Sequence, residues 1–193
     1  MPLLVDPALP PGSLRALRQP SLDVDDELVL RPWRSADIRA VKAAFDHPDI
    51  QRWHVRRIDS DAEARGWISD WSQRWDHETD ASWAIVRDDD AIGQVGLRTI
   101  KLFAADAQMS YWVLSDARGA GVAARATRAL ARWVFDTLRL QRLSLMHSTE
   151  NPASCRVALS AGFPGEGIMR GYMLHTDGWH DTHVHGRLRT DAV

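Results

Sequence analysis

The sequence lacks the features that would tie it to an oxidising compartment, a membrane or nucleic acid. Cysteine occurs once, at Cys155, so no disulfide bond can form within the chain, and we expect a reducing compartment. No apolar run approaches the roughly 18 residues of a membrane-spanning helix, and Asp6 and Pro7 interrupt the apolar stretch that a signal peptide would need. The net charge of −2 gives no basic surplus for nucleic acid. We therefore expect a cytoplasmic protein that binds neither a membrane nor nucleic acid.

The length and composition of the sequence are typical of one globular domain. Hydrophobic residues make up 45% of its 193 residues, which is enough for a sizeable core, and most of its nine tryptophans are expected to lie there. Residues 1–25 hold five of the nine prolines, which predicts an N-terminal extension that is ordered only where it packs on the domain. We assign residues 26–190 to the domain itself.

The hydrophobic pattern predicts an α/β fold with the element order βααβββαβαββ, a mixed and mostly antiparallel sheet of about seven strands flanked by helices. Ser35 is the expected N-cap of the first helix, which residues 46–49 (DHPD) should end. Asp177 and Gly178 predict a type I′ turn in the last hairpin. The predicted strands cover 27–33, the hairpin 81–100, 108–114, 142–149 and the hairpin 167–188, and the predicted helices cover 35–45, 59–75, 122–138 and 151–162.

Small residues interrupt an otherwise bulky region at residues 118–123 (RGAGVA), between a predicted strand and a predicted helix. Gly119 and Gly121 permit backbone angles that other residues avoid, and the amide N–H groups at a helix start attract anions. Arg118 adds a positive charge. The loop could therefore hold a pyrophosphate against the main chain, although a glycine-rich turn without a ligand fits the same residues when they are taken alone.

Residues 118–123 read R-x-x-G-x-A, which resembles the coenzyme A pyrophosphate loop of the GNAT N-acetyltransferases. Other segments resemble the same superfamily in the same order: LRPWRSADI its opening strand and helix, AIGQVGL its central hairpin, and YWVLSDARGAG its splayed fourth strand and loop. NPASCRVALSAGF and DGWHDTHVHGRL resemble segments of the Rim-type branch, which modifies ribosomal-protein N-termini. The resemblance covers residues 27–188 and implies a single GNAT domain that uses acetyl-CoA and no metal.

The resemblance also implies which residues bind the cofactor. In this family the backbone of the fourth strand pairs with the pantetheine arm, and the loop amides take the pyrophosphate. Asn151 matches a family residue near pantetheine, and it can equally be a helix N-cap beside Pro152. The implied cofactor-binding residues are Val113, Leu114, Arg118, Gly119, Ala120, Gly121, Val122, Ala123 and Asn151.

The catalytic residues are less completely matched. Ser154 corresponds to the family serine that protonates the departing thiolate, unless it is only a polar residue of the first helical turn. The carboxylates that serve relatives as general base are replaced by Gln108 and Met173. His175 lies nearby with a suitable pKa for a base, although a plain strand histidine fits it too.

Without a strong base, the site should favour amines that are partly neutral at pH 7. An α-amine is neutral about once in seven molecules at that pH, and a lysine side chain only about once in 2,500. Trp53, His54 and Tyr172 are expected to contact the acceptor, a small-molecule amine or a protein N-terminus. A non-catalytic CoA-binding sensor and the transfer of another acyl group, such as succinyl, remain alternatives, and the protein is expected to be a monomer or a homodimer.

Cys155 and a group of histidines near the end of the sequence could suggest a different chemistry. Cys155 follows Ser154 and is interpreted as a helix-packing residue, since the family transfers the acetyl group directly. The histidines at 180, 183 and 185 with Asp181 suggest a metal, and His183 and His185 would share a strand face. We expect no metal, because the His-Asp pair has a counterpart in the family.

Overall fold

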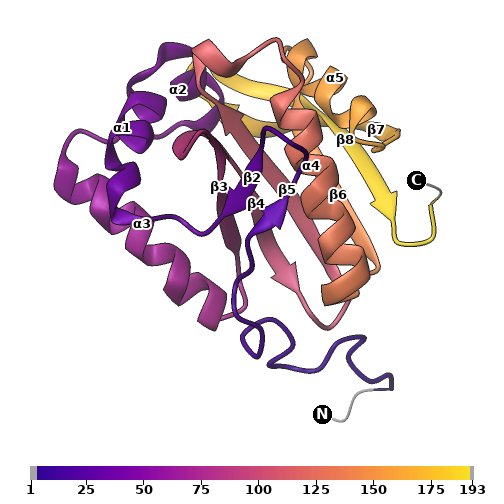
Figure 1. The fold of residues 1–193 in the computed structure, drawn as a ribbon. Helices are drawn as coiled ribbons and strands as arrows, with labels where there is room; N and C mark the ends of the chain where they lie inside the picture. Colours follow the sequence, from indigo (N-terminus) through magenta and orange to yellow (C-terminus); the bar gives the residue numbers. More distant parts are fainter. Residues whose placement is uncertain (1–3, 192–193) are drawn as a thin grey trace.

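The computed structural model describes residues 4–191 and contains one mixed sheet of eight strands, in the order β1-β2-β3-β4-β5-β6-β8-β7 (Figure 1). Only β5 and β6 are parallel neighbours, so the predicted α/β class and mostly antiparallel sheet are confirmed. The sheet has one more strand than predicted, because two residues of the N-terminal segment pair with β2. The strands are β1 (Leu22–Asp23), β2 (Val29–Arg31), β3 (Ala81–Arg87), β4 (Asp90–Lys101), β5 (Asp106–Val113), β6 (Arg142–Ser148), β7 (Gly165–His175) and β8 (Gly178–Leu188).

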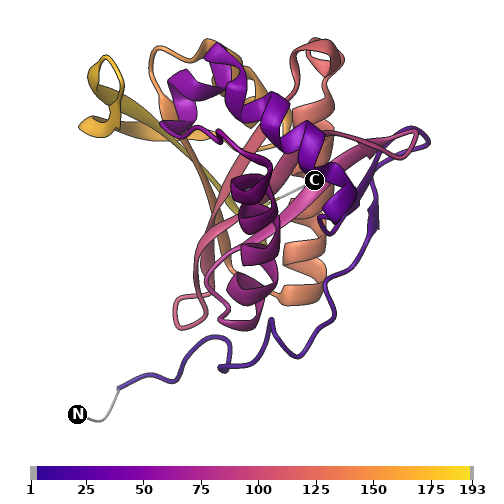
Figure 2. The ribbon, with the colours of Figure 1, turned by 90° about the vertical axis from the view of Figure 1, so that its left-hand side faces the viewer.

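Five α-helices cover the two faces of the sheet. Helices α4 and α5 pack on one face, and α1, α2 and α3 lie on the other (Figures 1 and 2). No helix of the described residues is long and apolar enough to cross a membrane. The helices are α1 (Ile38–Asp46), α2 (Pro48–His54), α3 (Asp61–Asp76), α4 (Val122–Trp133), which continues as a wider π turn over Val134–Leu138, and α5 (Pro152–Ser160).

The start of the first helix and the segment after it differ from the prediction. Ser35 is not an N-cap, because the Asp37 carboxylate accepts the backbone N–H of Arg34 at 2.8 Å and so satisfies that end itself. Residues 46–49 end the first helix as predicted, since α1 stops at Asp46 and His47 is extended, but the sequence did not predict that α2 begins directly afterwards. Proline is well tolerated there because the first helical residue needs no N–H partner, and Pro48 occupies that position.

The two hairpin turns divide between one confirmed prediction and one wrong one. Between β3 and β4, Asp88 and Asp89 both have positive φ (47° and 67°), as a type I′ turn requires. In the last hairpin His175 pairs with Gly178, so the turn residues are 176 and 177, and Gly178, at φ +129°, follows the turn. Neither Thr176 nor Asp177 has positive φ, so the type I′ turn predicted at residues 177–178 is wrong in both position and type.

The part of the proline-rich N-terminal segment from Leu14 to Pro20 packs against the domain. Leu14 is fully buried in the core. The indole N–H groups of Trp75 and Trp83 donate to the backbone carbonyls of Leu17 and Pro20, at 3.0 and 2.8 Å. These contacts meet the condition under which the sequence predicted an ordered segment.

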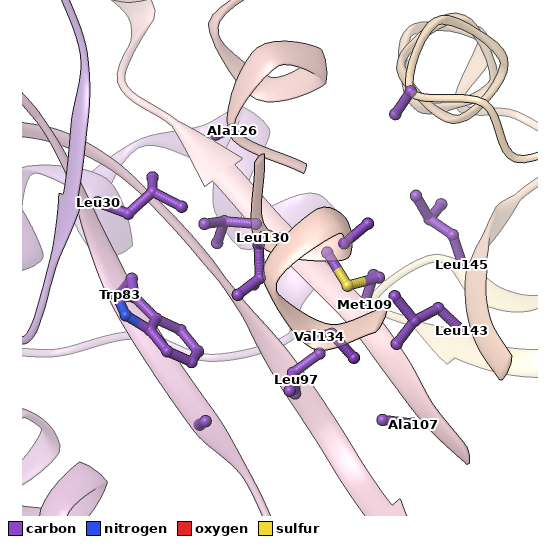
Figure 3. Packing of buried hydrophobic residues seen from close by; sticks show 14 of the residues in the cluster. Leu30, Trp83, Leu97, Ala107, Met109, Ala126, Leu130, Val134, Leu143 and Leu145 are labelled. Carbon is purple, nitrogen blue, oxygen red and sulfur yellow. The ribbon is translucent and has the colours of Figure 1, made fainter. Parts of the chain in front are cut away.

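The core lies between the sheet and α4, where Leu130 and Val134 face Leu97, Met109 and Leu143 of the strands (Figure 3). On the other face, Trp33, Phe45, Trp67 and Trp112 form an aromatic cluster between α1, α3 and the sheet. Most tryptophans are packed as predicted, whereas Trp179 on the last hairpin is 67% exposed. Both layers hold β5 rigidly in the centre of the sheet, which is where the candidate site lies.

Candidate active site

The site begins where two neighbouring strands separate. β5 and β6 pair from Asp106 and Arg142 up to Met109 and Leu145, and beyond that point they diverge. Residues 110–111 of β5 and 146–148 of β6, which no longer pair with each other, border a central cavity of about 210 Å³. Backbone groups along such an opening are free to pair with an extended ligand. The cavity is lined by Trp53, His54, Gln108, Met109, Ser110, Tyr111, Leu145, Met146, His147, Ser148, Asn151, Ser154, Met173 and His175.

The loop before α4 presents an uncapped helix N-terminus. Gly121 is the N-cap at φ +69° and has no side chain to accept the first N–H groups, and Gly119 has φ +83°. A Cβ atom at either glycine would meet no atom within 4 Å, so the positive φ and not crowding within the protein favours glycine there. The free N–H groups and the helix dipole make this loop an anion site.

The other loop residues divide between the loop surface and the core. Ala123 lines the groove beside the loop. Ala120 is exposed, and its carbonyl accepts a hydrogen bond from Arg125 at 3.4 Å. Val122 is 2% exposed and belongs to the core. Only the backbone N–H groups of these residues, and not their side chains, are therefore suited to hold a pyrophosphate.

Arg118 is not the free charge that the sequence suggested. Its Nη1 lies 2.7 Å from the Asp49 carboxylate of α2, and its Nε donates to the Val113 carbonyl at 3.0 Å. The same hydrogen bond lowers the pKa of Asp49. Arg156 of α5 lines the groove as well and adds a second positive charge that sequence reasoning missed. The sequence could have indicated Arg156, because it is a basic residue one helical turn after Pro152.

A groove joins the loop to the central cavity. One cavity of about 310 Å³ lies at the loop, and a second of about 390 Å³ lies between α2, β5 and α5. Val113 lines both. Leu114 lines neither, because its N–H donates to the Ile92 carbonyl at 2.9 Å and its side chain packs into the aromatic cluster. Successive strand amides point to opposite sides, so the N–H of Val113 is the one that faces the opening.

The start of α5 places Ser154 beside Tyr111. Asn151 caps this helix by accepting the N–H of Ser154 at 3.0 Å, as the sequence predicted. Ser154 lines both the central cavity and the groove. The Tyr111 hydroxyl donates to the Ser154 carbonyl at 3.3 Å, and burial raises the pKa of this phenol to about 12. Sequence reasoning did not single out Tyr111, although its place two residues before Val113 puts it on the same opening.

His175 lines the central cavity and has one ring nitrogen without a partner among residues 4–191. Its Nδ1 lies 3.1 Å from the Arg52 carbonyl, which can only accept, so Nδ1 carries the proton and Nε2 is left unprotonated. Nε2 is buried and has no hydrogen-bond partner in the described part of the chain. Burial, and then the charge of His180, lower the pKa of His175 below its usual range. The imidazole is therefore neutral at pH 7.

The residues predicted to contact the acceptor are only partly brought together. Trp53 and His54 line the central cavity, and the Trp53 ring packs edge-on against His175 at 5.5 Å. Burial lowers the pKa of His54 to about 4, so it stays neutral. Tyr172 lies elsewhere: it is 54% exposed on β7, because Met173 and His175 of the same strand point into the cavity and their neighbours point away.

A further chamber of about 340 Å³ adjoins the central cavity at Trp53 and His54, on the side of α3. Arg98 lines it and stacks over the Trp71 ring at 4.4 Å. The Gln94 Nε2 and Trp71 Nε1 atoms are buried without a hydrogen-bond partner in the described residues. The chamber is therefore rich in hydrogen-bond donors. Three arginines, at positions 56, 74 and 98, line it together with one carboxylate, that of Asp80.

The comparisons with known proteins agree with this geometry. The chain matches the acetyltransferase (GNAT) domain over residues 27–164. It is 26% identical, over 167 residues, to the uncharacterized N-acetyltransferase YoaA of Bacillus subtilis (strain 168), a match that covers 85% of this chain and 94% of that protein.

Two solved structures share the fold. The ribosomal L7/L12 α-N-protein acetyltransferase RimL, in complex with coenzyme A, is 18% identical to this chain with a TM-score of 0.80. The match covers 88% of this chain and 98% of the RimL chain. The microcin self-immunity acetyltransferase MccE, in complex with acetyl-CoA and AMP, is 18% identical with a TM-score of 0.78 and covers 86% and 94%. Because the family match runs from β2 to the end of α5, the protein belongs to the GNAT family of acetyltransferases.

Proposed function

We propose that the protein transfers an acetyl group from acetyl-CoA directly to a primary amine. The observation that carries this proposal is the continuous groove from the uncapped N-terminus of α4 to the opening between β5 and β6, where Ser154 and His175 line one cavity. When bound, acetyl-CoA supplies an activated acyl carbon at the end of an extended arm. The groove has the charge and the free backbone groups for each part of that molecule.

Cofactor binding follows from backbone groups more than from side chains. The N–H groups of residues 119–123 would hold the pyrophosphate, with Arg156 nearby. The N–H of Val113 would pair with the pantetheine arm, as an added strand pairs with a sheet edge. Arg118 would take part only if its ion pair with Asp49 is exchanged for one with a phosphate.

The chemistry needs one proton acceptor and one proton donor. As the amine nitrogen bonds to the acyl carbon, the carbon–sulfur bond breaks and the amine loses a proton. His175 Nε2 can take that proton, because it is unprotonated and has no partner among the described residues. The hydroxyl of Ser154 can protonate the departing thiolate, and Tyr111 holds the backbone of Ser154 in place.

The chamber beside Trp53 indicates the character of the acceptor. Its unpaired donors and its arginines favour an acceptor that carries a carboxylate or a phosphate near the amine. Tryptophan rings in its wall would stack on a planar part of the same molecule. Both a small anionic amine and a protein N-terminus with an acidic residue meet this description. We further propose a cytoplasmic protein, monomeric or homodimeric, with no affinity for nucleic acid.

The experiment is thiol release from acetyl-CoA across a panel of acceptors. Each amine is tested as a pair, with and without a carboxylate or phosphate, alongside peptides with free N-termini and with succinyl-CoA as a second donor. We expect faster release with the anionic member of each pair than with its uncharged partner. Binding of acetyl-CoA without release for every acceptor would favour the non-catalytic sensor, and faster release from succinyl-CoA would favour a different acyl group.

A further inference from the structure

Four side chains that the acetyl transfer does not use converge on the α5 side of the sheet. They are His147 of β6, His183 and His185 of β8, and Cys155 of α5, and we call them the histidine–cysteine cluster. One ligand atom from each lies within 4.8 Å of all the others. His147 and His183 are directly paired in the antiparallel ladder, so their side chains leave the sheet on the same face.

Backbone hydrogen bonds fix the protons of the two buried imidazoles. His147 Nδ1 lies 2.8 Å from the Ser148 carbonyl, and His185 Nδ1 lies 3.0 Å from the Phe163 carbonyl. A carbonyl only accepts, so both Nδ1 atoms carry hydrogen and both Nε2 atoms present lone pairs. Metal-binding histidines in proteins are commonly oriented in this way, by an N–H donated to a carbonyl.

The two lone pairs point at the same place. The Nε2 atoms of His147 and His185 are 3.2 Å apart, although neither has a proton to share while both rings are neutral. Two lone pairs at that distance repel unless a cation lies between them. Zinc binds histidine nitrogen at about 2.0–2.1 Å in a tetrahedral arrangement, which places two such nitrogens about 3.3–3.4 Å apart.

The remaining two side chains complete a ligand set that suits zinc. Cys155 and His183 are partly exposed, and neither side chain makes a hydrogen bond within the described residues. One thiolate and three imidazoles form a soft, nitrogen-rich set that favours Zn²⁺ over Mg²⁺ or Ca²⁺. From at most 4.8 Å, these two groups need to close by only about 1 Å to reach tetrahedral spacing. Their exposure also gives the ion a path from solvent.

We propose that the histidine–cysteine cluster binds one Zn²⁺ ion between β6, β8 and α5. The ion takes no part in the acetyl transfer, which needs no metal in this family. It would cross-link the sheet to the helix that carries Ser154 and Asn151, and so stabilise the wall of the central cavity, which His147 also lines. This proposal does not depend on the proposed function.

The test uses the full-length protein after removal of metal with a chelator. Zn²⁺ is titrated by calorimetry, and Co²⁺ is used as a spectroscopic probe. We expect one equivalent of each to bind, with the visible absorption bands of tetrahedral cobalt and a sulfur-to-cobalt charge-transfer band. Zn²⁺ at a hundredfold excess over its Kd should raise the melting temperature, since it binds only the folded state.

Variants assign the ion to its ligands. Cys155→Ser should remove the charge-transfer band and weaken Zn²⁺ binding at least tenfold, and His185→Asn, which keeps a donor for the Phe163 carbonyl, should weaken it similarly. His77→Asn, which changes an exposed histidine at the C-terminal end of α3, is the control and should change nothing.

Two results would overturn the proposal. One is the absence of Zn²⁺ binding at 100 times the protein concentration. The other is binding that Cys155→Ser and His185→Asn leave unchanged but His180→Asn removes, which would assign the ion to the group formed by Glu150, Asp177 and His180. If His185→Asn does not fold, the partly exposed Cys155→Ser decides the question, because its loss of the charge-transfer band requires a bound thiolate.

Discussion

The sharpest consequence of the site concerns His175, which we expect to act as the general base. Replacing it by asparagine keeps an N–H donor for the Arg52 carbonyl but removes the basic nitrogen. Loss of a positioned base typically lowers the rate by about 10²–10⁴-fold, and a factor of 10² corresponds to about 2.7 kcal/mol. The exposed His77→Asn variant is the matched control.

The pH profile separates this role from a structural one. The groups that face His175 are Arg52 from α2 and His180 with Asp177 from the last hairpin, and burial together with His180 lowers its pKa below 6.5. In the unmodified enzyme, kcat/KM should therefore fall only when the pH drops below about 6.5, for every acceptor. In His175→Asn only the neutral amine can react, so the midpoint should move to the acceptor's own pKa, about 7.8 for an α-amine.

The assay is thiol release followed from pH 5 to pH 10 with a series of amines whose pKa values span about 7 to 10. A midpoint that already follows the acceptor in the unmodified enzyme, and that His175→Asn does not change, would refute the role of His175. The result would then support the simpler expectation from the sequence, in which the acceptor arrives already neutral.

Three other predictions follow from the same geometry. Gly121→Val should lower CoA affinity at least tenfold by calorimetry, about 1.4 kcal/mol. Gly171→Val should not, although that glycine of β7 has a similar φ (+56° against +69°) and equal free space, so equal losses would show only backbone strain. Ser154→Ala should lower kcat by roughly 10² with little change in the KM for acetyl-CoA, and an unchanged kcat would leave it a structural role. Folding lowers the pKa values of His54 and His175, so the unfolded chain binds more protons than the folded one at mildly acidic pH. The free energy of unfolding, measured with urea, should therefore fall as the pH drops from 7 to 5. A rise over this range would contradict the burial of these imidazoles.

The fold was predictable because its signals are local. Strand and helix periodicity, the Asp-rich turn at residues 88–89 and the glycine after α5 each act within a few residues, and the motifs matched one family in the right order. The errors were also local in origin. Residues 46–49 were correctly predicted to end the first helix, but the start of α2 was missed, because a proline is also favourable at the first position of a new helix.

The parts of the candidate site that consist of backbone groups were predictable from the sequence. The parts that depend on side chains far apart in the sequence were not. The uncapped turn before α4 follows from Gly119 and Gly121, which both adopt positive φ there. By contrast, Arg118 pairs with Asp49, 69 positions away, and no pattern in the sequence links the two. Tyr172 was misplaced because a bulge between Met169 and Met173 and the alternation of strand side chains decide which residues of β7 face the cavity.

The clusters whose residues come from several helices and strands could not be predicted from the sequence. The donor-rich chamber takes its arginines from the segment after α2, from α3 and from β4. The histidine–cysteine cluster needs the pairing of β6 with β8 and the position of α5 above them. The sequence showed that His183 and His185 share a face, but it did not bring His147 and Cys155 to them.

Direct acetyl transfer within the groove can be tested by following the acceptor, the thiol and the protein in one experiment. The protein is mixed with acetyl-CoA and an anionic α-amine, and the acceptor, the free thiol and the intact protein are measured together by mass spectrometry over several turnovers. We predict one acetyl group on the acceptor for each thiol released and no acetyl group on the protein at any time. An acetylated protein that forms and disappears during turnover, with Cys155 as the modified residue, would contradict direct transfer, and bound acetyl-CoA that no amine consumes would contradict catalysis itself.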